Sequence, residues 1–168
     1  MRWQPDDPRC EECGFEWSCE VDSAVRGFEA TLLRLPQRVD LDQWTQSHQD
    51  GVWSPAQYLW HLVDVLRIAT ERLWVVEVDP GAGLVCWDEN ALASVRRYER
   101  LSPRVAGIAF GDAIRTWVAV ARTVPSDLEV EHDAFGTMTA ADIIRRSAHE
   151  VHHHWLDIDR GLAQGPEP

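Results

Sequence analysis

The stretch WSPAQYLWHLVDV, residues 53–65, contains the clearest helix start in this chain of 168 residues. Ser54 is a favoured N-cap residue, a proline follows it at the first helical position, and Gln57 stands where a capping box places its reciprocal side chain. Trp53 before the cap and Tyr58 four positions after it are spaced to form a hydrophobic staple. The stretch therefore predicts a long helix whose first turn is fixed by its own side chains.

Start and stop signals of the same kind divide the rest of the chain. They predict helices over residues 22–35, 55–76, 88–98, 102–123 and 139–160. Gly161 is predicted to end the last helix. The segment 37–52 is polar and 124–137 contains Pro125 and Gly136, so both are predicted to be loops. No stretch shows a convincing period of two. The predicted class is therefore all-α, with four main helices and a shorter one in a bundle.

Composition and charge exclude several kinds of protein. Apolar residues make up 45% of the chain and charged residues 26%, which is typical of a globular protein. The net charge of −12 argues against nucleic acid as a partner, and we interpret the pairs Arg96–Arg97 and Arg145–Arg146 as solvated helix faces. No apolar run approaches the roughly 18 residues that span a bilayer. With no signal peptide visible, we expect a cytoplasmic protein without a membrane partner.

The first 20 residues differ in composition from the rest. They hold three of the four cysteines and no helical period, so we predict an irregular arm over residues 1–20 and a helical bundle over residues 21–168. Within the arm, CEECGF at 10–15 is a turn of the kind that presents two thiolates to one zinc ion.

A zinc ion at Cys10 and Cys13 needs two more ligands. Cys19 is a candidate for the third, and Cys86 or a histidine for the fourth. The alternative is a pair of reduced thiols packed in the arm, and the sequence does not choose between the two.

Four of the seven histidines fall in HEVHHH at 149–154. A helix presents residues four apart on one face, so His149 with His153, or Glu150 with His154, can hold a metal ion. An exposed histidine-rich helix face is the alternative to a metal site.

Helical phase favours one of these pairs. The core stripe of this helix consists of Ile144, Ala148, Val151, Trp155, Ile158 and Leu162. His154 lies about 80° and Glu150 about 120° from the centre of that stripe. His149 and His153 lie near the opposite pole, so we predict that they are exposed and that Glu150 and His154 face the bundle. Asp157 follows on the same flank, where it can hold the second nitrogen of His154.

His61 is the candidate third ligand. It shares a helix face with Tyr58, Val65 and Ile68. A lone histidine in such a place is more often a core residue, and it gains weight only beside the cluster on the last helix. Three protein ligands would leave a coordination position open, as catalytic sites do.

The residues quoted so far carry a resemblance. WSPAQYLWHLVDV at 53–65, together with FGTMTAADIIRRSAHEVHHHWLDI at 135–158, resembles the DinB-like superfamily of four-helix bundles, which includes YfiT-like proteins and mycothiol-dependent maleylpyruvate isomerases. The resemblance places the family's metal ligands on His61, Glu150 and His154. It implies a divalent metal, zinc or nickel, and a low-molecular-weight thiol such as mycothiol as nucleophile.

Three functions follow from this sequence. The first is a metal-dependent transferase or isomerase that acts on a small molecule with a thiol cosubstrate. The second is a non-catalytic metal-binding or stress-response module that acts as a homodimer. The third is a metal-dependent hydrolase, for which Asp64 is a weak candidate base. The first function requires a cavity beside the metal, and we expect its walls to come from Tyr58 and His61, the loop 79–87, and the last helix around Glu150.

Overall fold

The computed structural model describes residue 5 and residues 7–34 and 41–164. Residues 1–4 and 6 of the predicted arm, and residues 35–40 and 165–168, lie outside the described part. In chain order the elements are α1 (Val21–Arg34), α2 (Leu41–Thr45), α3 (Pro55–Val78), the 3-10 turn η1 (Pro80–Ala82), α4 (Glu89–Arg96), the 3-10 turn η2 (Tyr98–Arg100), α5 (Pro103–Ala121), β1 (Glu129–His132), β2 (Gly136–Thr139) and α6 (Ala140–Ala163).

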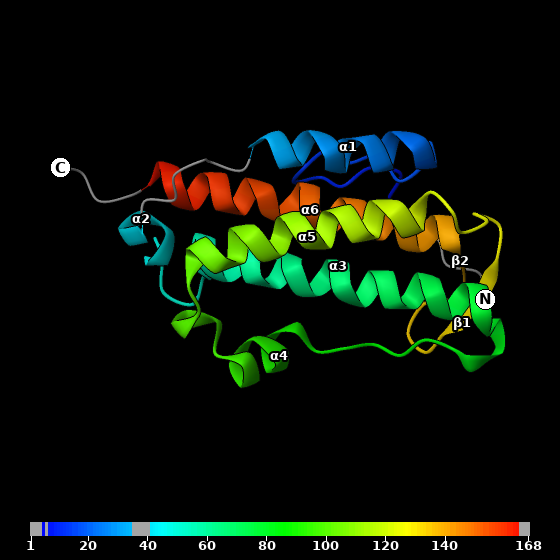
Figure 1. Cartoon of the computed structure of the whole chain (residues 1–168). Coiled ribbons are helices and arrows are strands. Elements are labelled where there is room, and N and C mark those ends of the chain that lie inside the picture. The colour runs from blue at the N-terminus through cyan, green and yellow to red at the C-terminus, as the bar shows by residue number, and fades with distance from the viewer. Residues whose placement is uncertain (1–4, 6, 35–40, 165–168) are drawn as a thin grey trace.

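Four long helices, α1, α3, α5 and α6, form the bundle (Figure 1). α3 packs against α5 and α6, and α1 covers the same two helices from the other side. The shared core contains the fully buried side chains of Leu59, Leu62 and Leu66 from α3, Ile114 from α5 and Ile144 from α6. The predicted four-helix bundle with a cysteine-containing arm is confirmed, and the described chain is mostly helical. In the described part of the chain, no helix is both long and apolar enough to span a membrane.

The start of α3 has the predicted cap. The backbone N–H of Gln57 donates to Ser54 Oγ, and the Gln57 side chain accepts from the backbone of Ser54 at 2.9 Å. The rings of Trp53 and Tyr58 meet edge to face with their centroids 5.5 Å apart. Both contacts fix how α3 enters the bundle, and they do so within two turns of His61.

The segment 124–137 is not the predicted loop. β1 and β2 form an antiparallel pair, with Glu129 opposite Thr139 and His132 opposite Gly136. Each strand has only four residues, too few for a period of two to stand out in a sequence. The pair is also joined to the segment before α4, because the Leu84 N–H donates to the Glu131 carbonyl at 2.7 Å. The predicted loop at 37–52 likewise contains α2, whose Trp44 is buried.

Gly161 does not end the last helix, which continues to Ala163. Its role is close packing. A Cβ atom at Gly161 would lie 2.9 Å from Pro55 Cγ, nearer than real Cβ atoms approach a neighbour. The glycine therefore lets the end of α6 touch the first turn of α3.

We predict that Gly161→Ala destabilises the protein even though alanine favours a helix. The added methyl group forces Pro55 or α6 to move, at a cost of about 1–3 kcal/mol. Gly107 in α5 is the matched control, because a Cβ there meets nothing within 4 Å. Gly107→Ala should raise stability by about 0.5–1 kcal/mol. Urea unfolding of both variants tests this, and a Gly161→Ala protein as stable as the control would contradict it.

Candidate metal centre

The fold brings three side chains together between α3 and α6. His61, Glu150 and His154 each offer a ligand atom, and these atoms lie within 4.8 Å of one another. His154 Nε2 is 3.4 Å from Glu150 Oε2, and the His61 and His154 rings stand nearly perpendicular with centroids 4.8 Å apart. These are the three residues that the sequence singled out, in the register that helical phase favours. That they bind a metal stays a prediction.

His61 is fully buried, and neither of its ring nitrogens has a hydrogen-bond partner among the described residues. The rings of Trp53 and Trp87 pack against it, with centroids 5.2 Å and 5.9 Å away. Burial, assisted by the nearby His154, lowers the pKa of His61 to about 4. The imidazole is therefore neutral at physiological pH and keeps a lone pair for a metal ion. An unpaired buried ring is costly by itself, so this observation fits a metal ligand.

His154 is oriented from behind by a carboxylate. Its Nδ1 lies 2.9 Å from Asp157 Oδ2, which is the contact predicted for Asp157, and the Tyr58 ring stacks on it at 5.3 Å. Burial lowers the pKa of His154, but hydrogen bonds with Glu150 and Asp157 raise it above its usual value. A carboxylate on the far nitrogen of a metal-binding histidine fixes the ring and raises its basicity.

Glu150 lies between two histidines. Its Oε2 faces His154, and its Oε1 lies 3.8 Å from His149 Nδ1. Burial acts to raise the pKa of Glu150, but hydrogen bonds from His149 and His154 lower it by more, so the carboxylate stays ionised.

Glu89 was not among the residues predicted for this site. Its Oε2 lies 4.0 Å from His61 Nε2, and burial together with the charge of Glu150 raises its pKa. Half of its side chain remains exposed. The sequence predicted only that Glu89 follows the first residue of a helix that begins at Asp88. No spacing in the sequence connects that position to His61.

Asp64, the weak candidate for a base, is engaged elsewhere. Its two carboxylate oxygens accept hydrogen bonds from Arg96 and Tyr98. The interpretation of Arg96 as part of a solvated helix face is therefore wrong, because its guanidinium pairs with the buried Asp64 carboxylate. Burial and the hydrogen bond to Asp64 raise the pKa of Tyr98, so its hydroxyl stays protonated.

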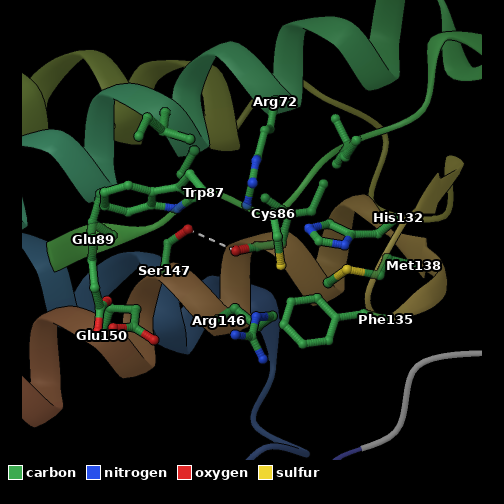
Figure 2. A pocket seen from close by; sticks show the side chains of 15 residues that line it. Arg72, Cys86, Trp87, Glu89, His132, Phe135, Met138, Arg146, Ser147 and Glu150 are labelled. Carbon is green, nitrogen blue, oxygen red and sulfur yellow. Dashed lines mark hydrogen bonds between the residues drawn. The ribbon is translucent and has the colours of Figure 1, made fainter. Parts of the chain in front are cut away.

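A cavity of about 160 Å³ adjoins Glu89 and Glu150 (Figure 2). In Figure 2 these two carboxylates lie at the left, while His132, Phe135 and Met138 lie at the right. The walls are formed by α3, the segment before α4, the β1–β2 hairpin and α6.

The cavity matches the expected walls in part. The loop 79–87 contributes Leu84, Cys86 and Trp87, and α6 contributes Glu150, as predicted. Tyr58 and His61 do not line it. The hairpin, which the sequence did not reveal, supplies His132, Phe135 and Met138 instead.

Two arginines line the same cavity. Arg72 and Arg146 stand on opposite sides of it in Figure 2. Arg72 donates to the Val85 carbonyl at 2.6 Å, and the Arg146 guanidinium lies 4.1 Å from the centre of the Phe135 ring. Burial lowers the pKa of both guanidinium groups. The interpretation of Arg145–Arg146 as a solvated face is therefore wrong for Arg146.

His149 and His153 are not exposed, contrary to the prediction. Their side chains are 16% and 22% exposed, which is close to the 19% of the His154 side chain. Helical phase places them correctly on the pole of α6 away from the bundle, but it cannot show what covers that pole. The arm lies there, and its Cys10 and Cys13 face the two histidines.

Comparisons with known proteins agree on family and fold. A model described as the DinB superfamily matches residues 25–158. YfiT from Bacillus subtilis, described as "a probable metal-dependent hydrolase with an unusual four-helix bundle topology", is similar in structure, with a TM-score of 0.71, 19% identity, and coverage of 96% of this chain and 94% of that one. No curated protein sequence matches the chain significantly.

Two further solved structures are similar. One is TT2238, described as a four-helix bundle protein, with a TM-score of 0.61, 18% identity, and coverage of 84% of this chain and 99% of the other. The second is the mycothiol-dependent maleylpyruvate isomerase, with a TM-score of 0.65 and 12% identity. That match covers 84% of this chain but only 60% of the isomerase. At these identities the likeness concerns the fold.

The environment of His61 predicts an unusual titration. In the metal-free protein, its NMR-measured pKa should lie well below the ordinary value of about 6.5, near the value of 4 that burial gives it. The pKa values of His154 and His149 should lie above 6.5, because nearby carboxylates stabilise the protonated imidazolium forms of both histidines. A His61 that titrates like a solvent-exposed histidine would show that its ring is not sealed in the core.

Proposed function

The chain belongs to the DinB superfamily, and on that premise we propose that it is a metal-dependent transferase or isomerase in which a low-molecular-weight thiol attacks a small anionic substrate. The ligands of the metal are His61, Glu150 and His154. One observation carries the proposal: these three side chains converge beside a cavity that also contains two arginines. An adjoining cavity favours an enzyme over a non-catalytic metal-binding module.

The donor set fits zinc or nickel. It consists of one neutral imidazole without another partner among the described residues, one imidazole held on its far nitrogen by Asp157, and one ionised carboxylate. Imidazole and carboxylate ligands suit both metals, and three protein ligands leave a position open. When bound, the metal supplies the positive charge that allows a thiol to exist as its thiolate at neutral pH.

The two arginines define the class of substrate. Guanidinium groups bind carboxylates through paired hydrogen bonds, and their attraction for an anion grows where water is scarce. Arg72 and Arg146 both lie in such a place, since burial lowers the pKa of each. They are the two guanidinium groups among the residues that line the cavity, which also include the carboxylates of Glu89 and Glu150. We infer that they hold a carboxylate of the substrate and direct its reactive carbon toward the metal.

Glu89 is the residue placed to move a proton. Its pKa is raised and its Oε2 lies 4.0 Å from His61 Nε2, so it would be placed to act as a general base or acid next to a metal ion held by His61. In a transferase it would accept the thiol proton. The same residue favours the hydrolase as the second candidate, in which water replaces the thiol and Glu89 accepts its proton.

We predict that His154→Ala removes one metal ion per chain, because it deletes a ligand. His48→Ala is the matched control, since His48 belongs to none of the described clusters of metal-binding side chains. Asp157→Asn should weaken binding by about 10–100-fold through the orientation of His154. Metal analysis by mass spectrometry after dialysis measures all three. A His154→Ala protein with the full metal content would refute this ligand assignment.

A cobalt-substituted protein tests the nucleophile. Adding mycothiol or cysteine should produce sulfur-to-cobalt charge-transfer absorption, whereas serine, which lacks the sulfur, should not. The Cys10→Ser/Cys13→Ser protein is the right host, because it contributes no thiolate of its own from the arm. Adding succinate should alter the thiol-bound spectrum in this host and not after Arg146→Gln.

If no thiol changes the spectrum, the transferase fails. The hydrolase then takes its place, and ester or amide cleavage that depends on Glu89 becomes the next assay.

A further inference from the structure

We propose that Cys10, Cys13, His149 and His153 form a second metal site, a structural zinc site that fastens the N-terminal arm to α6. The ligand atoms of all four residues lie within 4.8 Å of one another. Cys10 Sγ lies 3.7 Å from His153 Nδ1. Nothing in the proposed function uses these four side chains, and the site is distinct from the one at His61.

The composition and spacing of the ligands are those of a closed zinc site. The two cysteines are three positions apart in a turn, and the two histidines are four positions apart on one face of α6. Two thiolates and two imidazoles complete a tetrahedral shell, which leaves no position open for a substrate. This shell suits a structural zinc ion, whereas the three-ligand site on the other side of α6 suits catalysis.

The cysteine turn is formed by backbone hydrogen bonds. The Gly14 N–H donates to the Cys10 carbonyl at 2.8 Å, and the Cys10 N–H donates to the Phe15 carbonyl at 2.9 Å. Gly14 has a φ of +72°, a conformation that favours glycine at this position of the turn. Arg9 Nε donates to the Gly14 carbonyl at 2.7 Å and secures the turn from outside. The two sulfur atoms are thus brought together by the chain itself.

The thiols and the histidines both fit a cation between them. The two sulfur atoms and a ring nitrogen from each histidine lie within 4.8 Å of one another, close enough for one zinc ion to bind all four. His149 Nε2 is buried and has no hydrogen-bond partner among the described residues.

Each histidine also has a carboxylate at its other nitrogen. His153 Nε2 lies 3.5 Å from Glu12 Oε2, and His149 Nδ1 lies 3.8 Å from Glu150 Oε1. Carboxylates in this position orient metal-binding histidines and raise their basicity. One ring nitrogen of each histidine is thereby directed at the cysteines.

The other cysteines do not belong to this site. The sequence offered Cys19 as the third ligand and either Cys86 or a histidine as the fourth. The group contains neither of these cysteines, and two histidines take both places. The Cys19 carbonyl accepts from Arg145, and Cys86 is exposed next to Asp133 on another side of the molecule. A thiol pair used for redox chemistry would not require two histidines with carboxylates behind them.

The site has a structural consequence for the arm. Phe15 and Trp17 pack their rings on His149, with centroids 5.7 Å and 4.5 Å away. His152 Nε2 lies 3.0 Å from the Cys13 carbonyl. Zinc would hold the arm over the pole of α6 that helical phase alone assigns to solvent.

The metal content of the purified wild-type protein tests the proposal. We expect two zinc ions per chain. The Cys10→Ser/Cys13→Ser variant should retain one, held at His61, while His61→Ala should lose that one and keep the zinc of the arm. Cys19→Ser is the matched cysteine control and should retain both ions. Because each variant removes a different ion, failure of the arm site and failure of the proposed active site are distinguishable.

A measurement on the unmodified protein covers the case in which the serine variant does not fold. Titrating zinc-loaded wild-type protein with an organomercurial reagent should release one of its two zinc ions, since only the arm site depends on thiolates. Release of no zinc, or a stoichiometry of one that the double serine change leaves intact, overturns the proposal.

Discussion

The carboxylate of Glu150 is the interaction on which the rest of the site depends. It is ionised, and it lies between His154 on the bundle side of α6 and His149 on the arm side. An ionised carboxylate among apolar helices is stable only when positive or hydrogen-bonding groups surround it. Its two histidine neighbours provide them, and each histidine belongs to a different candidate metal-binding cluster. The Glu150 side chain therefore contacts one histidine of each candidate cluster on α6.

This connection gives the arm a role beyond anchoring. If zinc fixes His149, then Nδ1 of that ring has one orientation toward Glu150 Oε1. Glu150 in turn has one orientation toward His154 and the cavity. The proposed arm site would thus preorganise Glu150 as a ligand of the proposed metal centre through direct contacts, as outer carboxylates do for histidines in other metal centres.

Much of the fold and part of the site could be predicted from local sequence. The caps at Ser54 and Thr139 use side chains within three residues of the helix start, so they can be read directly. Helical phase is also local information, and it distinguished Glu150 and His154, which face the bundle, from His149 and His153 on the opposite pole of the same helix. Phase says which way a residue points, but not what covers it.

The parts that could not be predicted depend on distant segments. Arg146 lines a cavity that has the β1–β2 hairpin as another of its walls. Each strand of that hairpin has four residues, which is too short to be recognised from the sequence alone. Glu89 meets His61 through the packing of the α4 segment against α3, which no spacing in the sequence encodes. His149 and His153 are covered by an arm about 140 positions earlier in the chain.

Anomalous diffraction from crystals of the zinc-loaded protein would show whether α6 binds a metal ion on each side of Glu150. We expect two peaks at the zinc edge, one among His61, Glu150 and His154 and one among the arm cysteines and the two histidines that face them. The Glu150 side chain should separate the two peaks. A map with no peak between α3 and α6 would contradict it, because the three converging side chains would then have a structural role alone.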